Sequence, residues 1–240
     1  MSAVVEPSLG RRVAVAAPST TVVLVRHGQT VWHADNRYAG AGNDIDLTAT
    51  GQVQVRQLAA WAARRRPDAV VCSPVRRAVE TARPSADVTG KPLQMLEDLR
   101  EVGFGMAEGH TLDELHARDP EMVRRFRDDP VRHPFPGAES PLAAAARCAA
   151  VLRELATARP GGTILVVAHN TVLRLGMCSL LDLPVRRYRQ LFPRLDNAAV
   201  SEIRLPVDPA EPASLLSLND RLDALPLDAP PFDGRPVDAH

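Results

Sequence analysis

The stretch TVVLVRHGQT, residues 21–30, constrains the fold of this chain more than any other. Its apolar run Val22–Val25, mostly β-branched, is typical of a strand buried in the middle of a sheet. Arg26, His27 and Gly28 end that run abruptly. A cation and an imidazole at this point would lie at the carboxyl edge of the sheet, where open α/β folds bind ligands. Three residues alone do not distinguish an anion site from a solvated histidine, so other strand ends must decide.

A second apolar run, Ala69–Cys72, is followed by a pattern typical of a helix start. We expect Ser73 to be the N-cap and Pro74 the first helical residue. The first turn of that helix carries Arg76 and Arg77, and helix N-termini favour anions through their free amides. A second polar cluster is therefore expected at a second strand end.

A third apolar run, Thr163–Ala168, ends on His169. Amphipathic segments lie between the three runs, and we expect helices at about 48–66 and 141–158 with one apolar face each. The expected faces consist of Val55, Leu58, Ala59 and Ala62 in the first helix, and of Leu142, Ala145, Ala149, Leu152 and Ala156 in the second. Other expected elements are an edge strand at 91–95, helices near 111–118, within 119–139 and at 170–181, and strands at 197–204 and 214–218.

This alternation predicts an α/β fold, namely a single three-layer αβα domain with a mostly parallel central sheet. We assign the domain to residues 20–219, with residues 1–19 as a flexible leader and 220–240 as a tail rich in Pro and Asp. Residues 31–48 are too irregular in pattern for a helix or strand, and their length predicts a loop lying over a site.

Composition limits the class of partner. The 240-residue chain has a formal net charge of zero, so no overall field favours nucleic acid or a membrane surface. No run approaches the roughly 20 apolar residues that a membrane helix needs. Cys72, Cys148 and Cys178 are widely spaced and lack metal-ligand spacing, so we expect buried reduced thiols, which suits a cytoplasmic location.

Arg26, Arg77, His27 and His169 would converge on one edge of such a sheet. Several positive groups packed together without a counter-charge repel one another and destabilise a fold. A phosphate resolves the conflict, because arginines bind its oxygens bidentately. A carboxylate or sulfate would satisfy the same electrostatics, so charge alone predicts an anion site without selecting the anion.

An ordered set of motifs identifies the family that the chain resembles, the histidine phosphatase superfamily, also called the phosphoglycerate mutase-like family. The motifs are LVRHGQT at 24–30, RYAG at 37–40, DIDLTATGQVQ at 44–54, CSPVRRAVETA at 72–82, LREVGFGMAEG at 99–109, PGAES at 136–140 and VVAHNTVLRL at 166–175. They run in family order from about residue 21 to 204. The resemblance implies a phosphoglycerate mutase-like fold.

The resemblance also implies roles for individual residues. His27 matches the nucleophile that takes the phosphoryl group, and Glu101 matches the proton donor. Arg26, Arg77 and His169 match the phosphate-binding groups, with Arg77 chosen over its neighbour because the family's arginine precedes alanine. On this scheme His169 is protonated, and Glu101 must carry a proton before it can donate one. The scheme needs no metal or other cofactor.

Two positions depart from the family pattern and put specificity in doubt. The family usually has Trp-Asn where this chain has Trp32-His33, and commonly has glycine where it has Asn170. His33 would either add a donor to the pocket or face solvent. With Gln29 and Arg37, these two residues are the expected substrate contacts.

The expected activity is that of a metal-independent phosphomonoesterase, which hydrolyses a small phosphorylated metabolite through a phosphohistidine on His27. The alternative is a cofactor-dependent phosphoglycerate mutase-type phosphotransferase, although such enzymes usually carry a longer insertion than this chain has between Arg77 and His169. A third possibility is a member without activity that only binds a phosphorylated ligand or a protein. We expect no nucleic-acid or membrane partner, and the sequence leaves a homodimer open.

Overall fold

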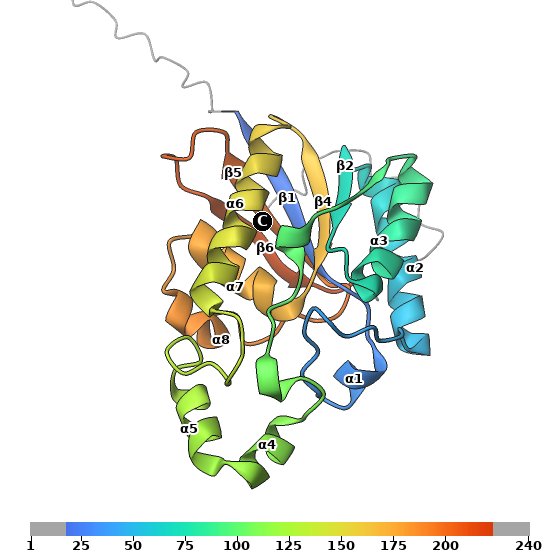
Figure 1. The fold of residues 1–240 in the computed structure, drawn as a ribbon. Coiled ribbons are helices and arrows are strands. Elements are labelled where there is room, and N and C mark those ends of the chain that lie inside the picture. Colours follow the sequence, from blue (N-terminus) through green and yellow to red (C-terminus); the bar gives the residue numbers. More distant parts are fainter. Residues whose placement is uncertain (1–17, 223–240) are drawn as a thin grey trace, which may run out of the picture.

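The computed structural model describes residues 18–222, which form an α/β fold around a six-stranded sheet (Figure 1). The strand order is β3-β2-β4-β1-β5-β6. The strands are β1 (Ser19–Arg26), β2 (Ala69–Cys72), β3 (Leu93–Met95), β4 (Thr163–Ala168), β5 (Val200–Pro206) and β6 (Ser214–Asp220). The first four are parallel to one another, whereas β5 pairs antiparallel with both β1 and β6. The expected mostly parallel sheet is confirmed. Of the expected leader at 1–19 and tail at 220–240, residues 1–17 and 223–240 lie outside the described residues, whereas Ser19 begins β1 and Asp220 ends β6.

Helices cover both faces of the sheet. The helices are α1 (Val31–Ala34), α2 (Ala49–Arg65), α3 (Arg76–Thr89), α4 (Leu112–Arg118), α5 (Pro120–Asp128), α6 (Pro141–Thr157), α7 (Asn170–Leu180) and α8 (Tyr188–Leu191). In β1 the side chains alternate, so Val23 and Val25 pack with α2 and α3, whereas Val22 and Leu24 pack with α6 and α7. Figure 1 shows α2 and α3 on one side of the strands and α6 on the other. The three-layer arrangement is confirmed.

A smaller cap lies beyond one end of the sheet, where Figure 1 shows α1, α4 and α5. Its core is aromatic. The ring of Tyr38 lies 5.0 Å from that of Phe104 and 5.5 Å from that of Phe135, and Phe135 stacks on Phe126 at 4.0 Å. A capping box between Thr111 and Glu114 begins α4. These contacts hold the segment after β1 against the segment after β3, so both loops lie over the same edge of the sheet.

Three local expectations are wrong. Ser73 caps no helix, because α3 begins at Arg76 with Val75 as the N-cap residue and no side-chain cap. In α6, Leu142 is 56% exposed and does not belong to the apolar face, which the other four residues form. The segment expected to be irregular contains the single turn of α1, capped by the Thr30 side chain.

The three cysteines are free and buried, as expected. Burial raises the pKa of the Cys72 and Cys148 thiols to about 12 and that of Cys178 to about 11. Among residues 18–222, no helix is long and apolar enough to cross a membrane.

Gly51 makes the closest backbone approach in the frame of the site and supplies a test of it. A Cβ atom there would lie 2.2 Å from the carbonyl oxygen of Gln29, two residues after His27. A glycine-to-alanine change in a helix normally stabilises by about 1 kcal/mol. We expect Gly51→Ala instead to lower the free energy of unfolding by about 1–3 kcal/mol, measured by thermal and denaturant unfolding.

Gly42→Ala is the matched control, because a Cβ atom at that position would have no other atom within 4 Å. Equal melting temperatures for the two variants would show that α2 and the loop after β1 are not in tight contact.

Candidate active site

The register of the parallel strands brings three polar residues to one edge of the sheet. Arg26 in β1 is level with Ala168 in β4, so His27 and His169, one residue further along each strand, are neighbours. Their ring centroids lie 5.2 Å apart. Ser73 follows β2 and donates its backbone N–H to Val167 of β4 at 2.9 Å. Side chains from three separate segments therefore meet at the carboxyl ends of three adjacent strands.

The hydrogen bonds of His27 determine which ring nitrogen holds the proton. Nδ1 lies 2.7 Å from the carbonyl oxygen of Gly28, which can only accept, so Nδ1 carries the hydrogen. Nε2 is then left with a lone pair, and the Nε–H group of Arg77 donates to it at 3.2 Å. Asn197 donates to the backbone carbonyl of His27 at 2.8 Å and fixes the main chain from the other side. The imidazole is therefore a neutral nucleophile with Nε2 presented.

Arg77 is fully buried and joins His27 to the loop above it. Its two terminal nitrogens donate to the carbonyl oxygens of Asn43, Ala39 and Gly40 at 3.0–3.2 Å. Its neighbour Arg76 instead lies half-exposed in ion pairs with acidic side chains. Of the two arginines, only Arg77 reaches the histidines, and a bound anion would compete with Nε2 of His27 for its Nε–H group.

His169 is oriented by Ser73. Its Nε2 lies 2.8 Å from the Ser73 hydroxyl, which already accepts from the backbone N–H of Val75. The hydroxyl proton is therefore available for Nε2, and in that tautomer Nδ1 of His169 carries a hydrogen. Nδ1 of His169 and Nε of Arg26 are both buried, and neither has a hydrogen-bond partner. Two buried polar groups without protein partners are therefore available in one site to hydrogen-bond a ligand.

Glu101 is buried beside the same edge, and three backbone amides donate to it. Oε1 accepts from Val102 and Val172 at 2.9 Å, and Oε2 accepts from Thr171 at 3.0 Å. Two of these amides belong to the first turn of α7, so the carboxylate occupies that helix N-terminus. Because Oε2 accepts a single bond, it retains a lone pair that can take a proton.

Burial and mutual repulsion keep the imidazoles neutral. Desolvation is the main reason that the pKa values of His27 and His169 lie well below the usual value, and nearby cationic groups lower both further. Burial also lowers the pKa of His33 to about 3 and that of Arg26 to about 10. Without an anion beside it, His169 is therefore neutral, and a bound anion would raise its pKa, so the expected protonated form with phosphate stays a prediction.

A cavity of about 340 Å³ is lined by Arg26, His33 and Glu101, whereas His27, Arg77 and His169 are not among its lining residues. Its walls carry both polar and aromatic side chains: Arg26, His33, Asn36, Arg37, Tyr38, Ala39, Glu101, Phe104, Leu112, Asn170, Thr171, Arg174, Tyr188, Arg189 and Asn197. His33 faces this cavity rather than solvent alone, with its ring 4.8 Å from that of His27. Arg37 lies on the wall but is held in a two-point ion pair with Glu114. Asn170 lies on the wall with its amide oxygen buried and unpartnered.

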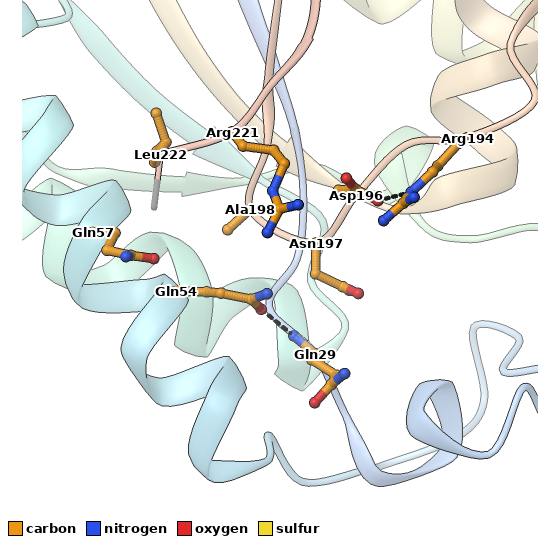
Figure 2. Close-up of a pocket in the computed structure, with 9 residues that line it drawn as sticks. All are labelled: Gln29, Gln54, Gln57, Arg194, Asp196, Asn197, Ala198, Arg221 and Leu222. Atoms are coloured by element: carbon orange, nitrogen blue, oxygen red, sulfur yellow. Dashed lines mark hydrogen bonds and ion pairs between the residues drawn. The ribbon is translucent and has the colours of Figure 1, made fainter. Parts of the chain in front are cut away.

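Gln29 lies elsewhere. It lines a separate pocket of about 180 Å³ together with Gln54, Arg194 and Asn197 (Figure 2). Its side-chain oxygen accepts from Thr48, and its backbone N–H donates to Gln54. Figure 2 shows these amide side chains around the loop that follows β1, and Gln29 is not among the residues that line the larger cavity, although Asn197 lines both pockets.

Four residues that act on the site were missed by the sequence reasoning or given another role. Ser73 was assigned to a helix cap, and Asn197 to a strand. Thr81, which accepts from the backbone N–H of Gly28 at 3.0 Å, has no sequence signal of its own. Arg174 could have been found from its place four residues after Asn170 on a helix that starts at the site. Within the described part of the chain, no group of three or more His, Cys, Asp or Glu side chains is placed to hold a metal ion.

A family model, curated relatives and a solved structure all relate this chain to the same superfamily. Residues 22–218 match the model of the histidine phosphatase superfamily (branch 1). Phosphoserine phosphatase 1 of Hydrogenobacter thermophilus is 30% identical over 77% of this chain and 86% of its own length. A probable phosphoglycerate mutase, GpmB of an Enterobacter species, is 32% identical over 76% of this chain and 83% of its own. A phosphoserine phosphatase from Entamoeba histolytica, solved with 3-phosphoglyceric acid, is 26% identical with a TM-score of 0.73, covering 84% of this chain and 98% of that one.

The low pKa values predict how stability depends on pH. Between pH 6.5 and the lowered folded-state values, the unfolded chain binds more protons at these histidines, so stability falls as pH falls. For His33, with a pKa of about 3, we expect His33→Asn to remove roughly 1–2 kcal/mol of the stability loss between pH 7 and pH 5. Denaturant unfolding at both pH values measures this difference.

His116 on α4 is exposed, so His116→Asn is the control and should keep the wild-type pH dependence. The same dependence in His33→Asn as in the wild type would mean that His33 is not buried as a neutral ring.

Proposed function

Since the chain belongs to the histidine phosphatase superfamily, we propose that it is a metal-independent phosphatase that hydrolyses a small phosphorylated metabolite through a phosphohistidine on His27. One observation carries the proposal. The lone pair of His27 Nε2 lies in a buried site where the Arg77 Nε–H group donates to it and where Nε of Arg26 and Nδ1 of His169 lack partners. A tetrahedral phosphoryl group supplies the oxygens that these groups lack.

In the first step, Nε2 of His27 attacks phosphorus, the N–P bond forms and the bond to the leaving oxygen breaks. Arg26, Arg77 and His169 hold the equatorial oxygens, where loss of one such donor typically costs about 10²–10³ in rate. Glu101, protonated on Oε2, gives its proton to the leaving alkoxide. The transfer leaves a carboxylate that is held in place by hydrogen bonds from three backbone N–H groups.

In the second step, water attacks the phosphohistidine from the side vacated by the alcohol. Glu101, now ionised, takes a proton from that water, and the N–P bond breaks to free His27 and inorganic phosphate. The Gly28 carbonyl keeps the hydrogen of His27 on Nδ1 throughout, so the same nitrogen is used in both steps.

The likeness to a probable phosphoglycerate mutase favours a second candidate, a phosphotransferase that returns the phosphoryl group to its substrate. The two activities share the phosphohistidine and differ in whether water or the alcohol takes up the phosphoryl group. The segment between Arg77 and His169 lacks the longer insertion that mutases of this fold usually carry, which supports hydrolysis.

The proposal also covers partners and location. A small phosphorylated substrate fits a cavity of this size, and the zero net charge offers no field for nucleic acid or a membrane surface. Three free, buried thiols support a cytoplasmic location. A homodimer is left open.

We expect His27→Ala to abolish turnover, because the nucleophile is removed, while the melting temperature stays within a few degrees of wild type. Hydrolysis of p-nitrophenyl phosphate measures turnover, and an acid-labile, alkali-stable phosphoryl label on the wild-type chain reports the intermediate. His116→Ala is the control on an exposed histidine. Turnover retained by His27→Ala would mean that another group is the nucleophile.

Hydrolase and mutase are separated by one incubation with 3-phosphoglycerate and a primer of its bisphosphate. We expect free phosphate to accumulate and the 2-phospho isomer to stay near background. Rapid isomer formation with little phosphate would identify the mutase. Binding of phosphate esters without release of either product would identify a member without catalytic activity.

A further inference from the structure

The cavity beside His27 has a polar wall that the phosphoryl chemistry does not use. Asn170 is the first residue of α7 and Arg174 lies four residues later, so the two share one face of the helix. Both line the cavity that Arg26 and Glu101 also line. This wall therefore faces the space that the alcohol part of a phosphate ester would fill.

Arg174 is a buried cation without a counter-charge. It is 7% exposed, and its Nε has no partner. Its one hydrogen bond to protein is a long one, from a terminal nitrogen to the carbonyl oxygen of Arg189 at 3.4 Å, and its guanidinium lies 5.1 Å from the ring of Tyr188. Glu101 is near enough to act on Arg174 electrostatically, but no ion pair joins the two side chains, and three backbone amides donate to Glu101. An unpaired buried charge is costly, so this site calls for an anion.

Arg189 adds a second cation to the same wall. It lines the cavity, and its guanidinium lies 5.2 Å from the ring of Phe126. Among residues 18–222, neither Arg174 nor Arg189 forms an ion pair with a carboxylate. The phosphoryl group already has Arg26, Arg77 and His169, so a separate anionic group of the substrate is needed here. A planar carboxylate presents its two oxygens to a guanidinium in matching geometry.

Asn170 requires a hydrogen-bond donor from the ligand rather than an anion. Its amide oxygen is buried and accepts no hydrogen bond, so a ligand at this point must bring an N–H or O–H donor. A bare anion would be repelled by that oxygen. The ligand that satisfies both residues carries a carboxylate with an amino or hydroxyl group close to it.

We propose that Asn170, Arg174 and Arg189 form a subsite for the alcohol part of the substrate, and that the substrate is a phosphate ester of a small hydroxy acid or hydroxyamino acid. The carboxylate binds Arg174 and Arg189, and the neighbouring hydroxyl or amino group donates to Oδ1 of Asn170. This inference rests on the proposed phosphatase activity and names its substrate class.

The wild-type enzyme is tested on five matched esters by release of inorganic phosphate. O-Phosphoserine and 3-phosphoglycerate carry both groups, 3-(phosphonooxy)propanoate lacks the donor, phosphoethanolamine lacks the carboxylate, and propanediol bisphosphate replaces the carboxylate by a second phosphate. We expect kcat/KM for the better of the first two to exceed that for phosphoethanolamine by about 100-fold, because buried polar groups left unpaired reject the incomplete ligand. A preference for the bisphosphate would overturn the carboxylate assignment.

Arg174→Gln tests the carboxylate contact. We expect the ratio of kcat/KM between the better carboxylate ester and phosphoethanolamine to fall at least about tenfold, mainly through KM, and Arg174→Lys to restore part of it. Arg56→Gln, an exposed arginine on α2, should leave both rates unchanged. If Arg174→Gln slows both esters equally, Arg174 contacts the phosphoryl group or only supports the fold, and the proposal is wrong.

Asn170→Gly tests the donor contact without filling the cavity. We expect the preference for the better of O-phosphoserine and 3-phosphoglycerate over 3-(phosphonooxy)propanoate to shrink at least about fivefold. A preference that survives unchanged would remove Asn170 from the subsite.

The panel also separates failure of this inference from failure of the phosphatase proposal. Phosphate release from all five esters at similar kcat/KM, with a labelled phosphohistidine, would leave the enzyme a phosphatase and contradict the subsite. No phosphate from any ester and no labelled histidine would contradict the phosphatase itself.

Discussion

The parallel pairing of β1 with β4 is the interaction on which the site depends. It makes Arg26 level with Ala168, so the residue after each strand is a histidine at the same height. A shift of the register by one residue would turn every side chain of β1 to the opposite face and bury the wrong set. The alternate packing of Val22 and Val23 on opposite helix layers excludes that shift. The apolar core therefore places the imidazoles with the accuracy that their chemistry needs.

Repulsion between buried cationic side chains is the second constraint at this edge of the sheet. Burial removes water from two arginines and three imidazoles, and the imidazoles are kept neutral, while the Glu101 carboxylate offsets part of the arginine charge. Arg77 donates hydrogen bonds to the loop at 39–43 and to His27, so its guanidinium is positioned before any ligand binds. The site is thus arranged in advance for negative charge, and a bound oxyanion would complete interactions that the protein groups do not make among themselves.

Much of this could be predicted from sequence because the decisive signals are local. Apolar runs predicted the strands on which His27 and His169 end, and the ordered motifs predicted that Arg77 rather than its neighbour would reach them. The failures have tertiary causes. Ser73 matched a helix cap in sequence, yet its hydroxyl bonds His169, 96 residues away. Two of the three amides that donate to Glu101 belong to a helix about 70 residues later, which no pattern around Glu101 reveals.

The burial of the three thiols affects how the enzyme responds to oxidants. Cys72 ends β2 immediately before Ser73, close to the reacting groups, yet burial keeps it as the thiol rather than the reactive thiolate. Cys148 and Cys178 are shielded in the same way. Peroxide and electrophiles inactivate phosphatases that use a cysteine nucleophile by modifying it. Under the proposed mechanism the nucleophile is an imidazole and the thiols are buried, so oxidants that inactivate cysteine-dependent phosphatases would leave this activity intact.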